Sequence, residues 1–263
     1  MKRILNESMP AGTAWAFTIG TALAFALVVE LFSGVALSLY YAPTPDHAWD
    51  SIHFIETQVH LGAFILGLHY WTTRVIIVLL GAHLVRIVLM GSYRPPRHLN
   101  WVVGVLLFLV VLGFAITGLL LRWDQGAYWA TVVRIGIAKL SPFVGDQVAA
   151  IARGGPDIGA LTLTRWYTAH AMILPVALLA LMLVHLTLRS RDGLSGPVRA
   201  QEGVREPYFP NQAARDVLVI GGTAVVIVFL ASSGMAPLEA PADPTDATAR
   251  AATARSRPSP RLP

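Results

Sequence analysis

Four histidines stand out in the 263-residue sequence because they lie in apolar segments and come in two pairs. His69 and His83 are 14 residues apart in the stretch "GLHYWTTRVIIVLLGAHLVRIVLMG". His170 and His185 are 15 residues apart in a later segment. A titratable side chain in lipid is costly and is usually functional. A single histidine is readily explained by a hydrogen bond to a neighbouring helix, but two pairs at nearly one interval indicate a common purpose.

Helix geometry predicts how the two pairs meet. Fourteen residues at about 100° each end about 40° short of four full turns, so His69 and His83 share one face. At about 1.5 Å per residue they are about 21 Å apart along the axis. Both histidine-bearing segments are predicted to cross the membrane in the same direction. Each of two levels therefore offers two imidazoles from facing helices.

Two facing imidazoles suit haem iron, which accepts a histidine ligand on each side. Zinc fits less well, since structural zinc sites use four protein ligands and each level supplies two. A proton relay would usually add carboxylates, and Glu30 is the only acidic residue inside a predicted span. The chain has no cysteine, which excludes C-x-x-C-H attachment. We therefore predict two non-covalent b-type haems, one at each level.

Two glycine pairs repeat the 14-residue interval on the segments that carry no histidine pair. Gly20 and Gly34 form the first, and Gly104 and Gly118 the second. Glycine lets another surface approach the helix backbone closely. Ordinary helix packing would explain any one of them. Because their interval matches that of the histidines, we predict that they form flat walls for two macrocycles inside a four-helix bundle.

The composition supports membrane helices as the elements that position these residues. The chain is 55% hydrophobic and 13% charged, against about 25% charged in typical soluble domains. Five apolar segments approach the roughly 20 residues needed to span a bilayer; they cover residues 15–41, 61–90, 101–121, 167–188 and 217–230. The predicted fold is an all-α integral membrane protein, a four-helix haem-binding bundle plus a fifth transmembrane helix.

Basic residues predict the orientation. The net charge is +5, and the basic residues lie at the ends of apolar segments, which marks topology rather than nucleic-acid binding. They concentrate at the N-terminus and in the 91–100 and 189–216 loops, which the positive-inside rule places in the cytoplasm. We predict a bundle over 1–190, a loop and fifth helix over 191–235, and a disordered outer tail over 236–263.

Several motifs resemble the cytochrome b/b6 family, and the b6 branch most. They include "LHYW", "GAHLVRI", "SYRPPRHLNWVVGV", "GFAITGLLLRWDQGAYWA" and "GALTLTRWYTAHAMILP". The resemblance covers about residues 12–235. It implies ligands at His69 and His170 for an outer haem, and at His83 and His185 for an inner haem. The haem-packing glycines of the family match Gly20, Gly34, Gly104 and Gly118. Arg86 and Arg97 match basic positions near the inner haem, where guanidinium groups suit propionates; inside-positive topology is the alternative explanation.

The sequence departs from the family pattern at several positions. Thr18 stands where cytochrome b6 has a haem-attaching cysteine, so no covalent haem is expected. Tyr70 replaces a basic residue, Arg122 a proline, and Glu30 a glutamine. "GMAPLEAPADP" resembles the approach to the family's PEWY motif, but no PEWY follows. A second chain bearing that motif is therefore an expected partner.

The resemblance implies the haem-bearing redox subunit of a quinol:cytochrome c, or similar, oxidoreductase complex, incomplete alone and coupled to proton translocation. Further expected partners are a Rieske iron–sulfur protein, a c-type cytochrome, membrane lipid and a second copy in a dimeric complex, with no nucleic acid. The expected location is a bacterial inner membrane, with the N-terminus cytoplasmic and the tail outside. One alternative is a non-bifurcating conduit between the quinone pool and an outer multihaem cytochrome. Another is a haem-free membrane scaffold.

Two groups of residues are candidates for binding quinone. The outer quinol candidates are Trp123, Asp124, Tyr128 and Trp129. Anchoring at the membrane interface is the commoner role for such loop residues. Arg189 and Arg191 are candidates for an inner quinone site, with snorkelling to the interface as the alternative.

Overall fold

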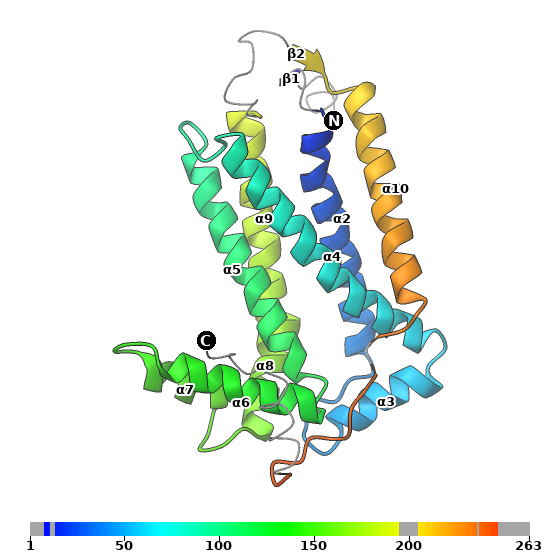
Figure 1. Ribbon diagram of the computed structural model, residues 1–263, viewed down its shortest axis with the longest axis vertical. Helices are drawn as coiled ribbons and strands as arrows, with labels where there is room; N and C mark the ends of the chain where they lie inside the picture. The colour runs from blue at the N-terminus through cyan, green and yellow to red at the C-terminus, as the bar shows by residue number, and fades with distance from the viewer. Residues whose placement is uncertain (1–7, 11–13, 195–204, 236, 247–263) are drawn as a thin grey trace, which may run out of the picture. The chain divides into compact units, whose positions relative to one another are not determined.

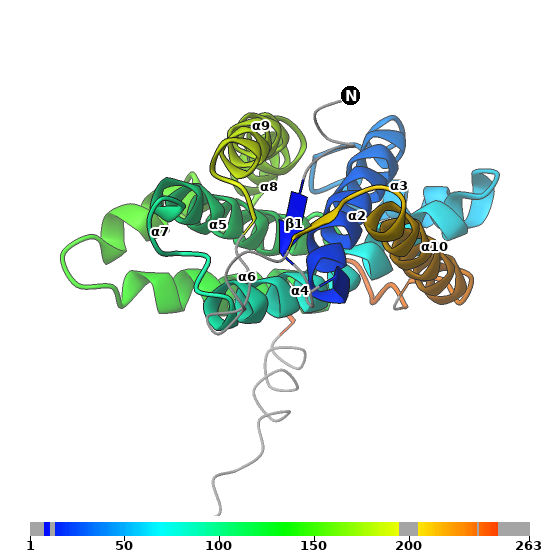
Figure 2. The ribbon, with the colours of Figure 1, turned by 90° about the horizontal axis from the view of Figure 1, so that it is seen from above.

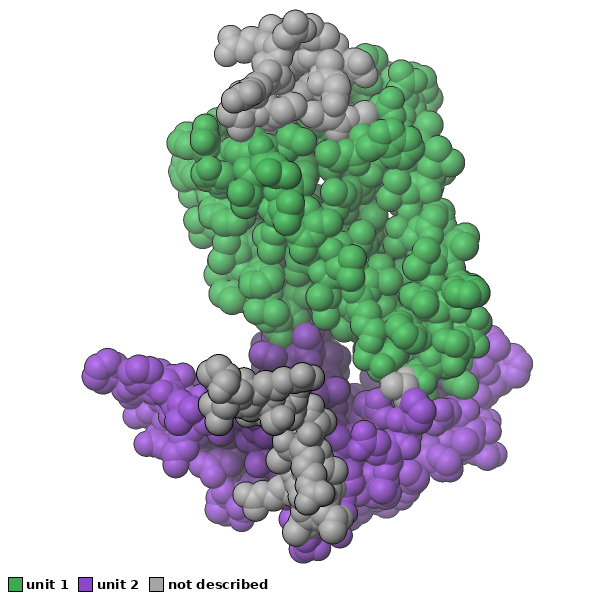
Figure 3. All heavy atoms as spheres, viewed as in Figure 1, with its two compact units in different colours: residues 1–36, 63–112, 175–235 green, residues 37–62, 113–174, 236–263 purple. Residues whose placement is uncertain are grey.

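The computed structural model describes residues 8–10, 14–194, 205–235 and 237–246. They fall into two compact units, shown in Figure 3. Unit 1 comprises residues 1–36, 63–112 and 175–235, and unit 2 comprises residues 37–62, 113–174 and 236–263. Several long helices begin in one unit and end in the other.

Five helical runs in the described residues are long and apolar enough to span a membrane. They are α2 (Ala14–Ser38), α4 (Gly62–Leu89), α5 (His98–Leu120), the continuous run of α8 (Ala160–Thr168), η1 (Ala169–Ile173) and α9 (Leu174–Asp192), and α10 (Asn211–Ala231). A helix satisfies its own backbone polar groups, as lipid requires. The predicted all-α fold with five spans is confirmed.

In unit 1, α10 packs on α2 and α4, as Figures 1 and 2 show. A buried cluster joins Leu23 and Ala26 of α2, Ile76 of α4 and Ile227 of α10. The backbones of α4 and α10 approach closely at Gly67, where a Cβ atom would lie 2.6 Å from the carbonyl oxygen of Ala231. The fifth membrane helix therefore packs directly on α2, which carries Gly20 and Gly34, and on α4, which carries His69 and His83.

Two short strands in unit 1 add a small ladder to the all-α fold. β1 (Ser8–Pro10) pairs antiparallel with β2 (Arg205–Pro207), and Met9 stands opposite Glu206. Each of these two residues precedes a proline, which favours extended backbone at the residue before it.

The connection over residues 122–166 folds into two amphipathic helices of unit 2, α6 (Gln125–Lys139) and α7 (Gly145–Arg153), followed by the start of α8. α7 ends at Gly154, whose positive φ of 75° suits the left-handed residue that often follows a helix. α3 (Ala48–Gln58) belongs to the same unit. Aromatic and aliphatic side chains of α3, α6, α7 and α8 share one buried cluster with Leu120.

Residues 237–246 differ from the predicted disordered tail, because this segment is tied to unit 2. Five hydrogen bonds between described residues join it there: Gln125 N to Ala240 O (3.0 Å), Ala242 N to Trp123 O (3.0 Å), Glu239 N to Asp124 Oδ2 (3.5 Å), the Trp49 indole to Glu239 O (2.7 Å) and the Arg122 guanidinium to Pro237 O (2.7 Å). The proline-rich composition of the segment predicted disorder, but its backbone forms hydrogen bonds with residues at the start of α6. Residues 247–263 of the predicted tail lie outside the described residues.

Candidate cofactor site

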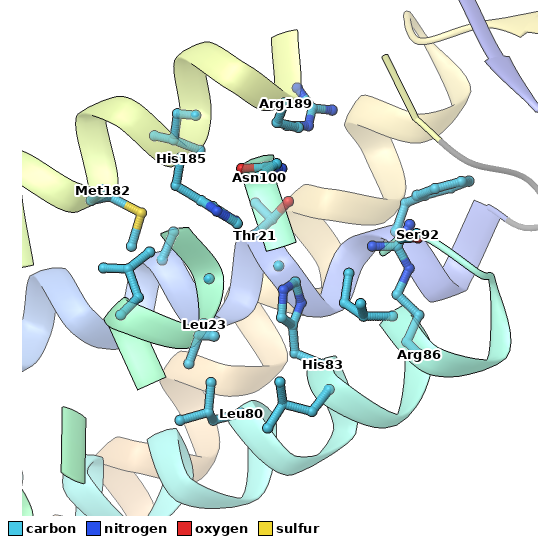
Figure 4. Close-up of a pocket in the computed structure, with 18 of the residues that line it drawn as sticks. Thr21, Leu23, Leu80, His83, Arg86, Ser92, Asn100, Met182, His185 and Arg189 are labelled. Carbon is cyan, nitrogen blue, oxygen red and sulfur yellow. The ribbon is translucent and has the colours of Figure 1, made fainter. Parts of the chain in front are cut away.

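His83 of α4 and His185 of α9 project into one cavity of unit 1 (Figure 4). The cavity measures about 370 Å³, within the range of about 300–1,000 Å³ that is usual for cofactor and small-molecule pockets. The structure thus brings together the two residues that the sequence predicts as the inner pair.

A glycine lies against each of these two rings. A Cβ atom at Gly20 would lie 3.6 Å from Cε1 of His83, and one at Gly104 would lie 3.6 Å from Cε1 of His185. Both glycines also line the cavity. A longer side chain at either position would occupy the space next to the ring. The two glycines therefore keep the cavity open and its wall flat.

The inner pair has an unmet polar requirement. Nδ1 of His83 is buried and has no hydrogen-bond partner among the described residues. A buried polar atom without a partner costs about 1–3 kcal/mol. The two buried imidazoles across a cofactor-sized cavity fit a bound haem iron.

Basic side chains also line this cavity. Arg86, Arg97 and Arg189 all contribute to its wall. The Arg86 guanidinium lies over the Phe17 ring, 4.6 Å from its centroid, and its Nε is buried without a partner in the described chain. Arg97 donates to the backbone oxygen of Gly193 at 3.1 Å. These guanidinium groups suit anionic carboxylates such as haem propionates.

The two arginines predicted for an inner quinone site have different surroundings. Arg189 lines the cavity described above. Arg191 instead forms an ion pair with Asp192, with 2.7 Å between Nε and Oδ1. Arg189 therefore remains the better placed of the two for a ligand at this end of unit 1.

His69 of α4 lies in unit 1 beside α2. A Cβ atom at Gly34 would lie 3.2 Å from its Cε1. Its Nδ1 is 3.0 Å from Oγ of Ser33 and 3.3 Å from Oε1 of Glu30. Unlike the inner rings, this imidazole has side-chain partners for its Nδ1.

His170 lies in unit 2, within the π turn η1. Its Nδ1 is 3.1 Å from Oγ1 of Thr117, and Phe114 packs edge-on against the ring with centroids 5.3 Å apart. A Cβ atom at Gly118 would lie only 2.6 Å from its Cε1. Since His69 and His170 belong to different units, their pairing at an outer haem stays a prediction.

His69 and His170 share a pattern of neighbours that was not predicted from the sequence. In both cases a hydroxyl residue directly precedes the glycine, as Ser33-Gly34 and Thr117-Gly118, and its oxygen meets Nδ1 of the histidine. Histidines that bind metals usually give their other ring N–H to such a partner. A Ser/Thr-Gly dipeptide on each facing segment was the available sequence signal.

A polar cluster near the start of α10 was also missed. Asp216 accepts hydrogen bonds from the Tyr208 hydroxyl at 2.8 Å and from the Gln212 amide at 3.0 Å. Asp216 and Tyr208 line the same cavity as the inner histidines. An aspartate directly before the fifth apolar segment was a signal for it, although the distance of about 30 residues from His185 hides their proximity.

The four outer quinol candidates are buried within unit 2. The exposed fractions of Trp123, Asp124, Tyr128 and Trp129 are 5%, 2%, 6% and 8%. Burial also raises the pKa of the Tyr128 hydroxyl. The three aromatic rings belong to the hydrophobic cluster of unit 2, so they have a packing role whatever else they do.

Asp124 is already engaged at the start of α6. Its Oδ1 accepts from the backbone N–H of Ala127 at 2.9 Å, which caps the helix. Its Oδ2 pairs with the Arg122 guanidinium at 2.6 Å. Arg122 thus balances a buried carboxylate and also donates to the backbone oxygen of Pro237.

Comparisons with known proteins agree with this arrangement. The family model described as cytochrome b(N-terminal)/b6/petB matches residues 74–243. The menaquinol:cytochrome c reductase cytochrome b subunit of Bacillus subtilis (strain 168) is 40% identical over 187 residues, which cover 71% of this chain and 84% of that protein. Cytochrome b6 of Gracilaria tenuistipitata var. liui is 34% identical and covers 74% of this chain and 91% of that one. A chain of a hyperthermophilic respiratory Complex III has a TM-score of 0.83 at 25% identity, covering 93% of this chain and 68% of that one.

Proposed function

Because the chain belongs to the cytochrome b/b6 family, we propose that it is the di-haem subunit of a bc-type quinol oxidoreductase complex. In this role it carries electrons across the membrane between a quinol-oxidising site and a quinone-reducing site. The observation that carries the proposal is the pair His83 and His185 facing one cavity of unit 1, with a glycine against each ring.

The residues of this cavity fit a haem by charge and by space. His83 and His185 would ligate the iron, while Arg86 and Arg97 would balance the propionates and Gly20 and Gly104 would leave room beside the rings. A b-type haem bound there supplies an iron centre that takes up and gives off one electron at a time. The rest of the wall is mostly apolar, with Thr21, Asn100 and Asp216 among its polar residues.

A second haem would be held by His69 and His170. Ser33 and Thr117 would each orient one of these rings through Nδ1, and Gly34 and Gly118 pack against them. Ligand orientation by such neighbours is usual at metal sites. With both haems present, the chain would provide a path from one membrane face to the other.

The coupled proton movement would follow from having quinol and quinone on opposite sides. Quinol oxidised near the outer face releases protons there, and quinone reduced near the cytoplasmic face takes them up. Arg189 would donate to a quinone oxygen at the cytoplasmic end. A place in a multi-subunit complex is supported by the Bacillus subtilis relative, which is named a cytochrome b subunit of a menaquinol:cytochrome c reductase. The partners that we propose are a PEWY-bearing chain and a Rieske protein or c-type cytochrome, in a dimeric complex of a bacterial inner membrane.

Haem content tests the proposal directly. The purified complex should contain two non-covalent b haems per chain, measured as the pyridine haemochromogen. His83→Ala should remove one of two redox components and leave the other. His60→Ala is a matched control, because this exposed histidine lies outside the spans. A wild-type complex without b haem would overturn the proposal.

A second candidate is a non-bifurcating conduit between the quinone pool and an outer acceptor. It is favoured by the buried state of the outer quinol candidates and by residues 237–246, which hydrogen-bond at the same start of α6. Pre-steady-state reduction separates the two functions. In a bifurcating complex, added quinol reduces the b haems through the outer site only while the Rieske partner is oxidised. In a conduit, the haems are reduced whatever the state of that partner.

A further inference from the structure

The cavity of unit 1 has a polar end and an apolar end. Its polar end is formed near the starts of α2, α5 and α10 and near the ends of α4 and α9, by residues that include Thr21, Arg86, Arg97, Asn100, Arg189 and Asp216. Deeper along these helices, beyond the two histidines, the wall includes the apolar residues Leu27, Leu80, Leu107, Val111 and Leu178. A ligand that fills the whole cavity must therefore be amphipathic, with its polar groups toward the ends of the helices.

Asn100 belongs to the polar end and lies beside a predicted haem ligand. It is one helical turn before Gly104, the glycine that packs against the ring of His185. The backbone of Asn100 is a hydrogen-bond partner of that ring. Figure 4 shows the Asn100 side chain in the cavity wall together with those of His185 and Arg189. A ligand bound at His185 would therefore lie within reach of the Asn100 amide.

The side-chain amide of Asn100 has an unmet hydrogen-bonding requirement. Its Oδ1 is buried and has no hydrogen-bond partner in the part of the chain that the structure describes. An asparagine amide has an acceptor oxygen and two N–H donors on one plane. Burying such a group without partners is unfavourable. The proposed function gives this amide no role, although a ligand in the cavity would supply a partner for it.

The charges of the polar end indicate which atom of the amide meets the ligand. Three arginines line this end, and Asp216 is the only acidic residue among the described residues of the wall. Its two carboxylate oxygens already accept hydrogen bonds, one from Tyr208 and one from Gln212. The polar end is therefore positive overall and favours an anionic group of the ligand. An anion accepts hydrogen bonds, so the amide nitrogen of Asn100 must face it, and rotation of the amide exchanges its oxygen and nitrogen.

We propose that Asn100 donates a hydrogen bond from its side-chain amide to a carboxylate of the ligand held between His83 and His185. The inference rests on the proposed function, in which the ligand is a haem and the carboxylate is one of its propionates. The bond fixes the acidic edge of the haem at the polar end of the cavity. It also withdraws negative charge from the propionate, which favours the ferrous state. Asn100 thus raises the reduction potential of the inner haem.

The test is a potentiometric titration of both haems in the intact complex, for wild type, Asn100→Asp, Asn100→Leu and Asn100→Thr. Asn100→Asp adds a negative charge beside the propionate. The ferrous-to-ferric ratio of the inner haem at a fixed potential should then fall about tenfold, or about 59 mV for a one-electron couple. Asn100→Leu removes the donor without adding charge and should give a smaller fall. Asn100→Thr keeps a hydroxyl that can donate, so its potential should be the nearest to wild type.

Asn211→Leu is the matched control. Asn211 is an exposed asparagine at the start of α10 and does not line the cavity, so its replacement should leave the inner potential unchanged. The outer haem is an internal reference, because its predicted ligands His69 and His170 are not part of this cavity. Resonance Raman spectra add a readout that a purely structural role would not move. The propionate bending vibration of the inner haem should shift in Asn100→Leu and stay constant in Asn211→Leu.

The outcomes separate this inference from the proposed function. If both haems are bound and the inner potential and propionate vibration are unchanged in Asn100→Leu and Asn100→Asp, the role of Asn100 is refuted and the proposed function stands. A higher ferrous fraction in Asn100→Asp also refutes it, because the ligand would then be a donor at this position. If Asn100→Leu does not assemble, equal inner potentials in Asn100→Asp and Asn100→Thr refute it instead. Failure of His83→Ala to remove any haem refutes the ligand assignment itself.

Discussion

A glycine lies against the ring of each of the four membrane histidines. A Cβ atom added at Gly20, Gly34, Gly104 or Gly118 would lie 3.6, 3.2, 3.6 or 2.6 Å, respectively, from Cε1 of the facing histidine. The sequence interval predicted glycine walls for a macrocycle, and the structure shows that the nearest neighbour of each glycine is an imidazole. The ring orientation therefore depends on the absence of a side chain on the facing helix.

Gly118→Ala should displace the ring of His170 further than alanine at any of the other three glycines displaces its own facing histidine. Its Cβ would lie 2.6 Å from Cε1 of His170, which real atoms do not tolerate, so the ring must move. We expect loss of one haem component and a destabilisation of about 1–3 kcal/mol, as in other overpacked sites. Haem content and the thermal midpoint in detergent would measure both effects.

Gly81→Ala is the matched control for this prediction. Gly81 also lies in a membrane helix, and a Cβ there would meet nothing within 4 Å. Alanine is about 0.5–1 kcal/mol better than glycine inside a helix, so this variant should keep both haems and its stability. Equal behaviour of the two variants would contradict the proposed contact between Gly118 and His170.

The π turn η1 (Ala169–Ile173) explains why the two histidine intervals differ. The backbone N–H of Leu174 reaches the oxygen of Ala169, five residues earlier, where an α-helix would use four. A π turn accommodates one additional residue. The 15-residue interval from His170 to His185 contains this turn, whereas the 14-residue interval from His69 to His83 lies in the regular helix α4.

The close approach of α4 and α10 gives a prediction for the fifth helix. In Gly67→Ala the new Cβ would lie 2.6 Å from the backbone oxygen of Ala231, so α10 must shift. We expect faster hydrogen–deuterium exchange over residues 211–231, measured by mass spectrometry. Gly221→Ala on α10 is the control, since a Cβ there meets nothing within 4 Å. Unchanged exchange in Gly67→Ala would show that the two helices do not pack in this way.

The two units contribute differently to the predicted haem sites. Unit 1 holds both predicted inner ligands and their cavity, whereas the predicted outer pair takes one histidine from each unit. Large apolar side chains such as Phe32, Val78, Leu183 and Phe229 remain exposed on the long helices. Helices that are apolar on all sides are typical of membrane spans, so this exposure suits a multi-pass membrane protein.

Arg122 should control the attachment of residues 237–246. Arg122→Ala removes the bond to Pro237 and leaves the buried Asp124 without its cation. Hydrogen bonds to charged groups contribute about 1.5–3 kcal/mol, so the amides of Gln125 and Ala242, which bond across this contact, should exchange about tenfold faster or more. Lys139→Ala is the control, because its ion pair with Asp146 is exposed and such pairs contribute little. Equal exchange in both variants would contradict this role of Arg122.

The sequence alone predicts the number of membrane helices. It also predicts where the histidines lie on these helices and how far apart they are along each axis. These properties depend on one segment at a time, because each helix satisfies its own backbone and has a constant rise per residue. The Ser33 and Glu30 contacts with His69, the attachment of residues 237–246 at Arg122 and the β1–β2 pairing were not predictable in this way. Each joins side chains or backbone from segments that are not adjacent in the chain, and only the packing of those segments decides which groups meet.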